Sequence, residues 1–471
     1  MATADITHSR IPADVQERWK TVRDVIAGDQ AMRAAGYLPV LNAADKSDEN
    51  KARNEAYVQR AVFYNATGRT LDGLIGIAFR KDPAHELPEY LDYLLTDCDG
   101  EEASIYQQSQ AVAASVVGVG RHGLLVDYDT RLKRPVIKSY AAESIINWRY
   151  ENGALVLVVL AETVEEPEDG GYYGVEEIQQ YRELYLDAGQ YKCRLWRLTG
   201  EANIPAVHQQ LDANGAALDE VAVRSQTGGL AFIPFRFVGS RNNDAAFDQS
   251  PLYDLARLNI AHYRNSADYE DSVFFVGQAQ PWISGLTEEW RDHLQAQKTA
   301  YIGSRAPFLL PEGGAFGFAQ PSENTLVHEA MEQKEKQMIG LGARLLDKTA
   351  VQVTATQSDN DREASTSVLS LCIANVNEAY QTCISWCALL LSKSPLTLEA
   401  EQASYKITQD YSRAQIDPQA LAGMVAAWQA GLIAKSDVRA YMRHQGIVAV
   451  ERTDEAIDGD LTAQGPALGL M

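Results

Sequence analysis

The sequence predicts an α+β fold that is mainly helical. Three segments, 251–275, 326–346 and 366–393, have helical periodicity and are long enough for extended helices. Short apolar runs between residues 124 and 198 are typical of strands, and they follow one another without helices between them. We therefore expect an α+β domain with a mostly antiparallel sheet at residues 52–240, followed by long helices.

Composition narrows the class of protein. The chain has 471 residues, 46% of them hydrophobic, which is enough for a sizeable core and about two to four domains. Its 64 acidic and 42 basic residues give a formal charge of −22. This charge disfavours tight DNA binding through counterion release, although an acidic or polar wall suits a channel through which DNA slides. No membrane-spanning run and no signal-peptide start is found, so an intracellular product is expected.

The N-terminal half is expected to begin with helices and to continue as strands. Residues 15–26 and 104–117 predict helices, and residues 55–81 predict one long amphipathic helix. Strands are expected at 124–128, 135–140 and 155–160, with a hairpin over 181–198 and a second hairpin turn at Asn214-Gly215. The acidic stretch 162–168 is expected to be a solvated loop.

The helix from Pro251 to about Phe275 carries the central hypothesis. Ser250 is expected to cap it, and a helix of this length extends roughly 37 Å. Its face is too polar for the deep core of a monomer, because Asn259, Ser266 and Glu270 interrupt it. We therefore expect it to be buried between copies of the chain, through Leu252, Tyr263 and Tyr269.

The remaining segments follow in order. Residues 277–324 form an insertion rich in Pro and Gly, and the return helix 326–346 carries the Glu332/Lys336 pair of an exposed helix. Residues 348–365 predict a long polar loop of functional importance. Helix 366–393 is expected to bury an apolar stripe that ends at Leu391, and it precedes a strand near 403–407. Helices at 418–430 and 435–444 and a frayed tail of 18 residues complete the expectation.

Cofactor and metal sites are not indicated. The five cysteines lack a CxxC motif, and Cys372, Cys383 and Cys387 share one helical face where thiols pack as small hydrophobic groups. No two histidines have metal-ligand spacing, so His262 and His328 are interpreted as ordinary helix residues. We expect no cofactor, no metal and no catalytic residues.

Two enzymatic alternatives are weaker. Residues 118–123 spell GxGxxG, but a helix precedes this motif and a strand follows it, which is the reverse of a dinucleotide-binding turn. A carbohydrate hydrolase would need a carboxylate pair such as Glu270/Asp271 or Asp127/Asp129, yet neighbouring acids are usually solvated faces.

Three stretches carry a resemblance to a known family: RAVFYNATGRTLDGLIGIAFRK at 60–81, GLLVDY at 123–128 and YAAESIINW at 140–148. Together with the order helix, insertion, helix, loop, helix over 250–393, they resemble the portal proteins of tailed bacteriophages over nearly the whole chain. The resemblance implies a portal-like fold, divided into an α/β wing (1–249), long stem helices (250–276 and 325–347), a small α/β clip (277–324), a tunnel loop (348–365), a long wing helix with its return (366–414) and a short helical crown with a tail (415–471).

The resemblance also implies site residues. The tunnel loop would face DNA, with Lys348 and Arg362 as its main cations and with Thr349, Gln352, Thr354, Thr356, Gln357, Ser358 and Asn360 as polar contacts. The clip would dock partners through Trp290, Arg291, Lys298, Tyr301 and Arg305. The stem residues Leu252, Tyr263 and Tyr269 would lie between subunits.

The implied function is mechanical. Such a chain forms a dodecameric ring at one capsid vertex and conducts double-stranded DNA, without sequence preference, during packaging and ejection. Its partners would be further copies of itself, the terminase large subunit, the head–tail adaptor, and the major capsid and scaffolding proteins, with no membrane. It would assemble in the host cytoplasm and reside in the virion. An alternative is another oligomeric virion protein, such as a baseplate or scaffold subunit, whose polar loop would line no channel.

Overall fold

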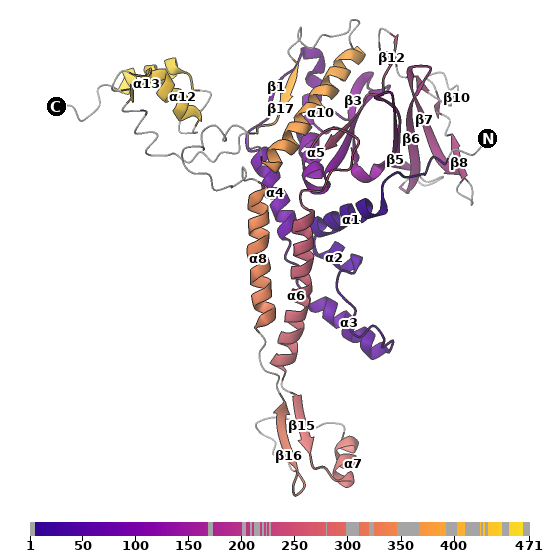
Figure 1. Ribbon diagram of the computed structural model, residues 1–471, viewed down its shortest axis with the longest axis vertical. Helices are drawn as coiled ribbons and strands as arrows, with labels where there is room; N and C mark the ends of the chain where they lie inside the picture. Colours follow the sequence, from indigo (N-terminus) through magenta and orange to yellow (C-terminus); the bar gives the residue numbers. More distant parts are fainter. Residues whose placement is uncertain are drawn as a thin grey trace, which may run out of the picture. The chain divides into compact units, whose positions relative to one another are not determined.

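The computed structural model confirms the α+β class (Figure 1). It describes residues 5–167, 173–199, 228–278, 280–297, 310–319, 325–345, 367–391, 403–409, 432–444 and 452–464, with short pieces between 204 and 225 and at 424 and 427–428. The chain divides into two compact units, Met1–Gln409 and Asp410–Met471.

Helices form the N-terminal part of the first unit. They are α1 (Ala13–Ala27), α2 (Asp29–Ala35), α3 (Asp48–Arg60), α4 (Ala66–Ala78) and α5 (Ile105–Val119), with the short strand β1 (Ala84–Glu86) and the 3-10 helix η1 (Glu89–Leu95) before α5. The single helix expected over 55–81 is wrong. The chain breaks at residues 61–65 because the Asn65 side chain accepts a hydrogen bond from Gly68 N at 2.8 Å and starts α4 as its N-cap.

A three-stranded antiparallel sheet lies at the centre of the core. Its middle strand β2 (Arg121–Asp129) pairs with β14 (Phe235–Gly239) and with β3 (Arg134–Ala141). Helices α5 and α10 (Val368–Leu391) contact each other and pack against this sheet. The apolar stripe predicted for α10 is confirmed up to Ile384, since Ile373, Val376, Tyr380 and Ile384 are fully buried, whereas Leu391 at its end is only half-buried.

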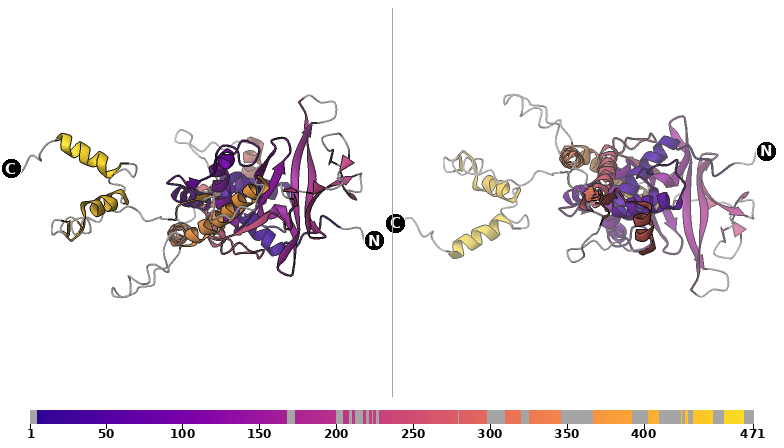
Figure 2. Two further views of the ribbon diagram at one scale, coloured as in Figure 1. Left: turned by 90° about the horizontal axis from the view of Figure 1, so that it is seen from above. Right: turned by 90° about the horizontal axis from the view of Figure 1, so that it is seen from below.

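A six-stranded antiparallel sheet follows. Its strands are β4 (Ile145–Glu151), β5 (Ala154–Pro167), β6 (Val175–Asp187), β7 (Gln190–Thr199), β8 (Ile204–Val207) and β11 (Val221–Ala222). In Figure 2 its long magenta strands stand at one side of the helices of the same unit. The hairpin predicted over 181–198 is confirmed by the β6–β7 register, which closes at Asp187 and Gln190.

The loop expected at 162–168 is wrong, because residues 162–167 continue β5 and pair with β6. Glu162 is drawn into this strand by partners: its carboxylate accepts hydrogen bonds from Tyr140, Gln180 and Arg182, each at 2.7 Å. The Asn214-Gly215 turn lies outside the described residues, although β9 (Gln210–Leu211) and β10 (Ala217–Leu218) pair on either side of it. A further short pair joins β12 (Arg224–Ser225) to β13 (Gly228–Gly229).

Two long helices, α6 (Tyr253–Gly277) and α8 (Leu326–Arg344), run side by side in opposite directions (Figure 1). The segment between them contains the antiparallel strands β15 (Gln280–Ser284) and β16 (Ala315–Ala319) and the helix α7 (Glu288–Gln297). Ser250 does not cap α6. Its hydroxyl instead donates to Gly118 O at 2.5 Å and ties the start of the helix to the end of α5.

The later elements match the expectation in part. The strand predicted near 403–407 is confirmed as β17 (Ser404–Lys406), which pairs with β1. In the second unit, α12 (Lys435–His444) is confirmed, and most of the helix expected at 418–430 lies outside the described residues. The frayed tail is wrong at Asp454–Gln464, which forms α13, because Asp458 of this helix pairs with Arg439 and Lys435 of α12.

Candidate assembly surface along α6 and α8

The N-terminal half of α6 is buried within its own chain. Helices α1, α3 and α4 all pack against α6. The contact between copies expected for Leu252 and Tyr263 is therefore wrong, since both side chains are fully buried here, with Phe63 packed edge-on at 5.4 Å from the Tyr263 ring. Tyr269 is half-buried and its ring lies 5.8 Å from that of His328 on α8.

Polar side chains of α6 are compatible with burial because partners satisfy them. The Asn259 carboxamide oxygen accepts hydrogen bonds from Thr67 N at 3.1 Å and from Thr67 Oγ1 at 3.0 Å, and its nitrogen donates to Tyr64 O at 2.8 Å. Buried polar groups that are paired in this way carry little penalty. The polar residue Asn259, which indicated an exposed helix, therefore joins α6 to the start of α4 by hydrogen bonds.

The next buried polar residue joins α6 to α8. His262 Nε2 lies 3.3 Å from Glu335 Oε1 of α8, and only 3% of the histidine side chain is exposed. Burial lowers the pKa of His262, while the hydrogen bond to Glu335 acts in the opposite direction. The imidazole is therefore neutral near pH 7, and the two helices share a polar contact.

The C-terminal half of α6 is clamped by α3. Arg53 donates both terminal nitrogens to the Asp271 carboxylate, each at 2.7 Å, and Arg60 adds a third contact at 3.0 Å. The same two guanidinium groups stack on aromatic rings, Arg60 over Phe274 at 3.6 Å and Arg53 over Phe275 at 4.8 Å. These contacts fix the helix while leaving one side of each ring uncovered.

Large apolar side chains remain exposed along this helix pair. On α8, Leu326 is 71% exposed and Ile339 is 73% exposed. On α6, Val273, Phe274 and Phe275 are between 38% and 48% exposed. A groove of about 460 Å³ runs beside Ile339, between α4 and α8, and its lining is mainly apolar: Ala66, Gly73, Leu74, Ile77, Met338 and Ala343. An apolar groove with an exposed apolar side chain beside it is a candidate for contact with another molecule. We call these exposed side chains and the groove the assembly surface.

Sequence reasoning missed Ile339. The signal that could have found it is its phase: Val327, Met331 and Met338 recur on the face of α8 that packs inward, and Ile339 falls outside this repeat. An apolar residue that departs from the buried phase of a helix is a candidate for contact with a partner.

The predicted clip residues are only partly placed. Trp290 and Arg291 lie on α7, where Arg291 pairs with Glu288 at 4.0 Å and with Asp292 at 3.5 Å. Lys298, Tyr301 and Arg305 lie outside the described residues.

The predicted DNA-facing residues lie outside the described residues: Lys348, Thr349, Gln352, Thr354, Thr356, Gln357, Ser358, Asn360 and Arg362. The two ends of this segment are described. Leu369 N of α10 donates to Leu345 O, which directly follows α8, at 3.3 Å. The polar segment therefore leaves and re-enters the fold at one point.

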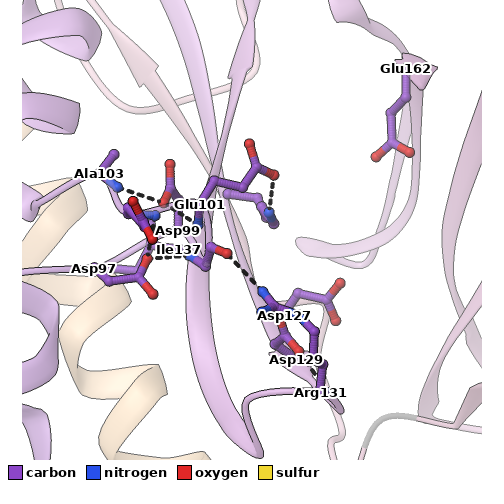
Figure 3. Close-up of polar contacts among 12 residues, drawn as sticks. Asp97, Asp99, Glu101, Ala103, Asp127, Asp129, Arg131, Ile137 and Glu162 are labelled. Atoms are coloured by element: carbon purple, nitrogen blue, oxygen red, sulfur yellow. Dashed lines mark hydrogen bonds and ion pairs between the residues drawn. The ribbon is translucent and has the colours of Figure 1, made fainter. Parts of the chain in front are cut away.

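The residues behind the two enzymatic alternatives have structural roles in this fold. In the GxGxxG motif, Gly118 belongs to α5 and Gly120 ends this helix in the left-handed region (φ 84°), as expected for a helix end before a strand. Figure 3 shows Asp127 and Asp129 near the end of β2. Asp127 pairs with Arg182 at 3.2 Å, whereas Asp129 accepts hydrogen bonds from the backbone N of Arg131 and Leu132. The Asp271 carboxylate is held by hydrogen bonds from Arg53 and Arg60 of α3.

The cysteines are all buried, which confirms the packing role predicted for the three thiols of α10. Burial raises the pKa of Cys372 to about 12. In the described part of the chain, no group of three or more His, Cys, Asp or Glu side chains is arranged to hold a metal ion. A search of the same residues for a helix able to cross a membrane found none.

Part of the chain matches a family model. Residues 251–390, less than a third of the chain, match a family described as a domain of unknown function (DUF4055). A search of curated proteins found no match.

Solved structures give distant likenesses at 14% identity. One chain of the virion of the native gene transfer agent particle has a TM-score of 0.41, and the match covers 82% of this chain and 92% of that one. A chain from the neck of the empty particle, computed with C6 symmetry, gives the same values. A chain from the neck of the native particle, computed with C12 symmetry, has a TM-score of 0.38 over 80% and 89% of the two chains.

Proposed function

We propose that this chain is the subunit of a phage portal ring, which stands at one capsid vertex and conducts double-stranded DNA. In this proposal α6 and α8 are the stem, the segment with β15, α7 and β16 is the clip, and residues 348–365 are the tunnel loop. The remaining elements of the first unit form the wing, and the second unit forms the crown.

The observation that carries the proposal is the assembly surface. Helices α6 and α8 pack against each other within one chain, yet Ile339, Phe274 and Phe275 are left exposed on the same two helices. Burying such side chains contributes about 1.5–3 kcal/mol each, and further copies of the same helix pair, arranged around an axis, would cover them. In a head-to-tail ring, the groove beside Ile339 on one copy faces a different surface of the next copy.

The charge and the loop position fit passage of DNA. A net charge of −22 opposes tight adhesion to phosphates, so DNA can slide. The 348–365 segment connects α8 to α10 and begins and ends at one point, Leu345 and Leu369, which suits a loop that projects toward an axis. In the proposal its hydroxyl and amide groups contact the DNA, while the clip binds the terminase and later the head–tail adaptor.

Electron microscopy of the purified chain tests the proposal directly. We expect rings with an axial channel, with twelve copies as the expected number. Compact monomers, filaments or plates would contradict the portal assignment, and plates would favour a baseplate or scaffold role.

The assembly surface itself is tested by Ile339→Glu. This change places a charge on an apolar contact without touching the core, so we expect rings to give way to soluble, folded monomers in mass photometry. Gln337→Glu is the matched control, because it adds the same charge at an exposed position of the same helix. Unchanged rings in the Ile339 variant would show that this surface lies outside the contact.

The loop assignment has its own test. Deletion of residues 351–361 is expected to leave ring assembly intact and to reduce the DNA packaged or retained per particle. Equal DNA content in particles with the deletion would contradict the assignment.

A further inference from the structure

The outer edge of the three-stranded sheet is only partly closed. β3 is an edge strand, and in an antiparallel pair every second residue points its N–H and C=O away from the neighbouring strand. Ile137 is one of these residues, since its N–H donates to Cys98 O at 2.7 Å and its C=O accepts from Gln108 Nε2 at 2.6 Å. Because the register with β2 is continuous, Pro135, Ser139 and Ala141 point the same way.

The outward-pointing residues of β3 differ in whether their backbone groups have hydrogen-bond partners. Pro135 lacks an N–H, and its C=O accepts the Tyr93 hydroxyl at 2.7 Å, so both outward residues at the start of the strand have partners. Ser139 is exposed, and its N–H and C=O and the N–H of Ala141 make no hydrogen bond with the described residues. The described residues therefore cover the first half of this edge and leave the second half open. Open strand edges are templates for pairing with another backbone.

A polar pocket adjoins the open part of the edge. It has a volume of about 360 Å³ and lies between β3, which contributes Lys138, Ser139 and Tyr140, and β5–β6, which contribute Glu162, Gln180 and Arg182. Its floor is held in place, because the largely buried Glu162 carboxylate, with 13% of its side chain exposed, accepts three hydrogen bonds, from Tyr140, Gln180 and Arg182. A side chain that enters here meets fixed polar groups.

The surroundings of the pocket carry an excess of negative charge. Figure 3 shows Asp97, Asp99 and Glu101 gathered on the loop beside Ile137, with Asp127 and Asp129 on the neighbouring strand. Four basic side chains of this region are paired with acids: Lys138 with Glu101 at 2.8 Å, Arg134 with Asp97 at 2.5 Å, Arg131 with Asp129 at 3.6 Å, and Arg182 with Glu162. Among the described residues, the hydrogen bonds to the Asp99 carboxylate come from the backbone N–H groups of Glu101 and Ala103, and Glu102 is exposed.

We infer that this edge, with the pocket beside it, binds an extended basic segment of another protein by strand addition. Ser139 and Ala141 would pair with the backbone of the segment, which is independent of its sequence, and the pocket would receive one lysine or arginine side chain. Charge favours a basic segment over a second copy of this chain, because the chain has a net charge of −22 and two copies would repel each other. The inference does not depend on the proposed ring.

The test uses the full chain and two fluorescein-labelled peptides that differ in charge only, acetyl-TKVKVKT-amide and acetyl-TEVEVET-amide. Fluorescence anisotropy should show saturable binding of the basic peptide and at least about tenfold weaker binding of the acidic one. Ser139→Pro removes an N–H that points away from β2 and spares the pairing with β2. Loss of its hydrogen bond should raise the Kd of the basic peptide about tenfold. Ser139→Ala keeps the N–H and should bind within about twofold of the natural chain.

Several results would overturn the inference: no saturable binding up to millimolar peptide, equal binding of both peptides, or equal binding by the proline and alanine variants. A change in copy number of the Ser139→Pro chain in mass photometry would mean that a second copy occupies the edge. If the proline variant does not fold, hydrogen exchange of the natural chain decides. The Ser139 amide should exchange rapidly when free and at least tenfold more slowly with saturating basic peptide, and an unchanged rate would overturn the inference.

Discussion

Replacement of Asn259 by alanine tests the contribution to stability of the hydrogen bonds that join α6 to the start of α4. The change removes two hydrogen bonds from Thr67 and one to Tyr64 O, at a position where Asn259 and Thr67 are both fully buried. Each lost bond is worth about 1 kcal/mol, and a buried group left without a partner adds to this. Alanine favours the helix by roughly 0.5 kcal/mol. We therefore expect a net loss of about 3 kcal/mol in the free energy of unfolding.

The assay is urea unfolding of dilute protein, followed by tryptophan fluorescence. Trp19 is buried on α1, which packs against α6, so its emission reports on this part of the core. Asn265→Ala is the matched control, because Asn265 is the same residue type on the same helix but is partly exposed. We expect the control to change stability by less than about 0.5 kcal/mol. Equal midpoints for the two variants, with equal slopes, would refute the claim that paired polar groups hold α6 in the core.

Two further predictions concern buried side chains. Tyr380→Asp places a charge where the Tyr380 ring is fully buried and its hydroxyl donates to Gln108 at 3.0 Å. The variant should be destabilised by several kcal/mol and should form no soluble assemblies. Soluble rings of this variant in electron microscopy would contradict the placement of α10. Burial, reinforced by Arg23, lowers the pKa of His122 to about 3, so the folded state stays neutral while the unfolded state takes up a proton below pH 6.5, and stability is lost as the pH falls. His122→Leu should therefore lose about 2 kcal/mol less than the natural chain between pH 7 and pH 5 in urea unfolding, and an equal loss in both proteins would show that His122 does not titrate as expected.

The elements that sequence reasoning placed correctly depend on local chemistry. The buried stripe of α10 recurs at helical spacing, so its burial follows from the helix period alone. The β6–β7 hairpin turns through Ala188 and Gly189, both with positive φ, directly between two strand-forming runs. The thiols of α10 share the phase of its apolar residues. In each case the deciding residues are neighbours in the chain.

The candidate site was harder to predict because its decisive contacts join distant segments. Leu252 and Tyr263 were expected between copies, yet helices α1, α3 and α4 bury them. The exposed side chains Phe274 and Ile339 were not identified, since exposure depends on which helices pack nearby. Sequence reasoning found the helix pair and its insertion but not the surface that the pair presents.

The sequence by itself determined where the long helices run, that the chain is α+β, and that its cysteines pack as apolar groups, because periodicity and turn chemistry act over a few residues. Only the tertiary structure decided that the acidic run after Ala161 is a strand and that a polar helix lies in the core. The reason is the same for both: Glu162 accepts a hydrogen bond from Arg182, and Asn259 accepts one from Thr67. A polar residue is buried or exposed according to the partner that the fold brings to it, and that partner lies far away in the sequence.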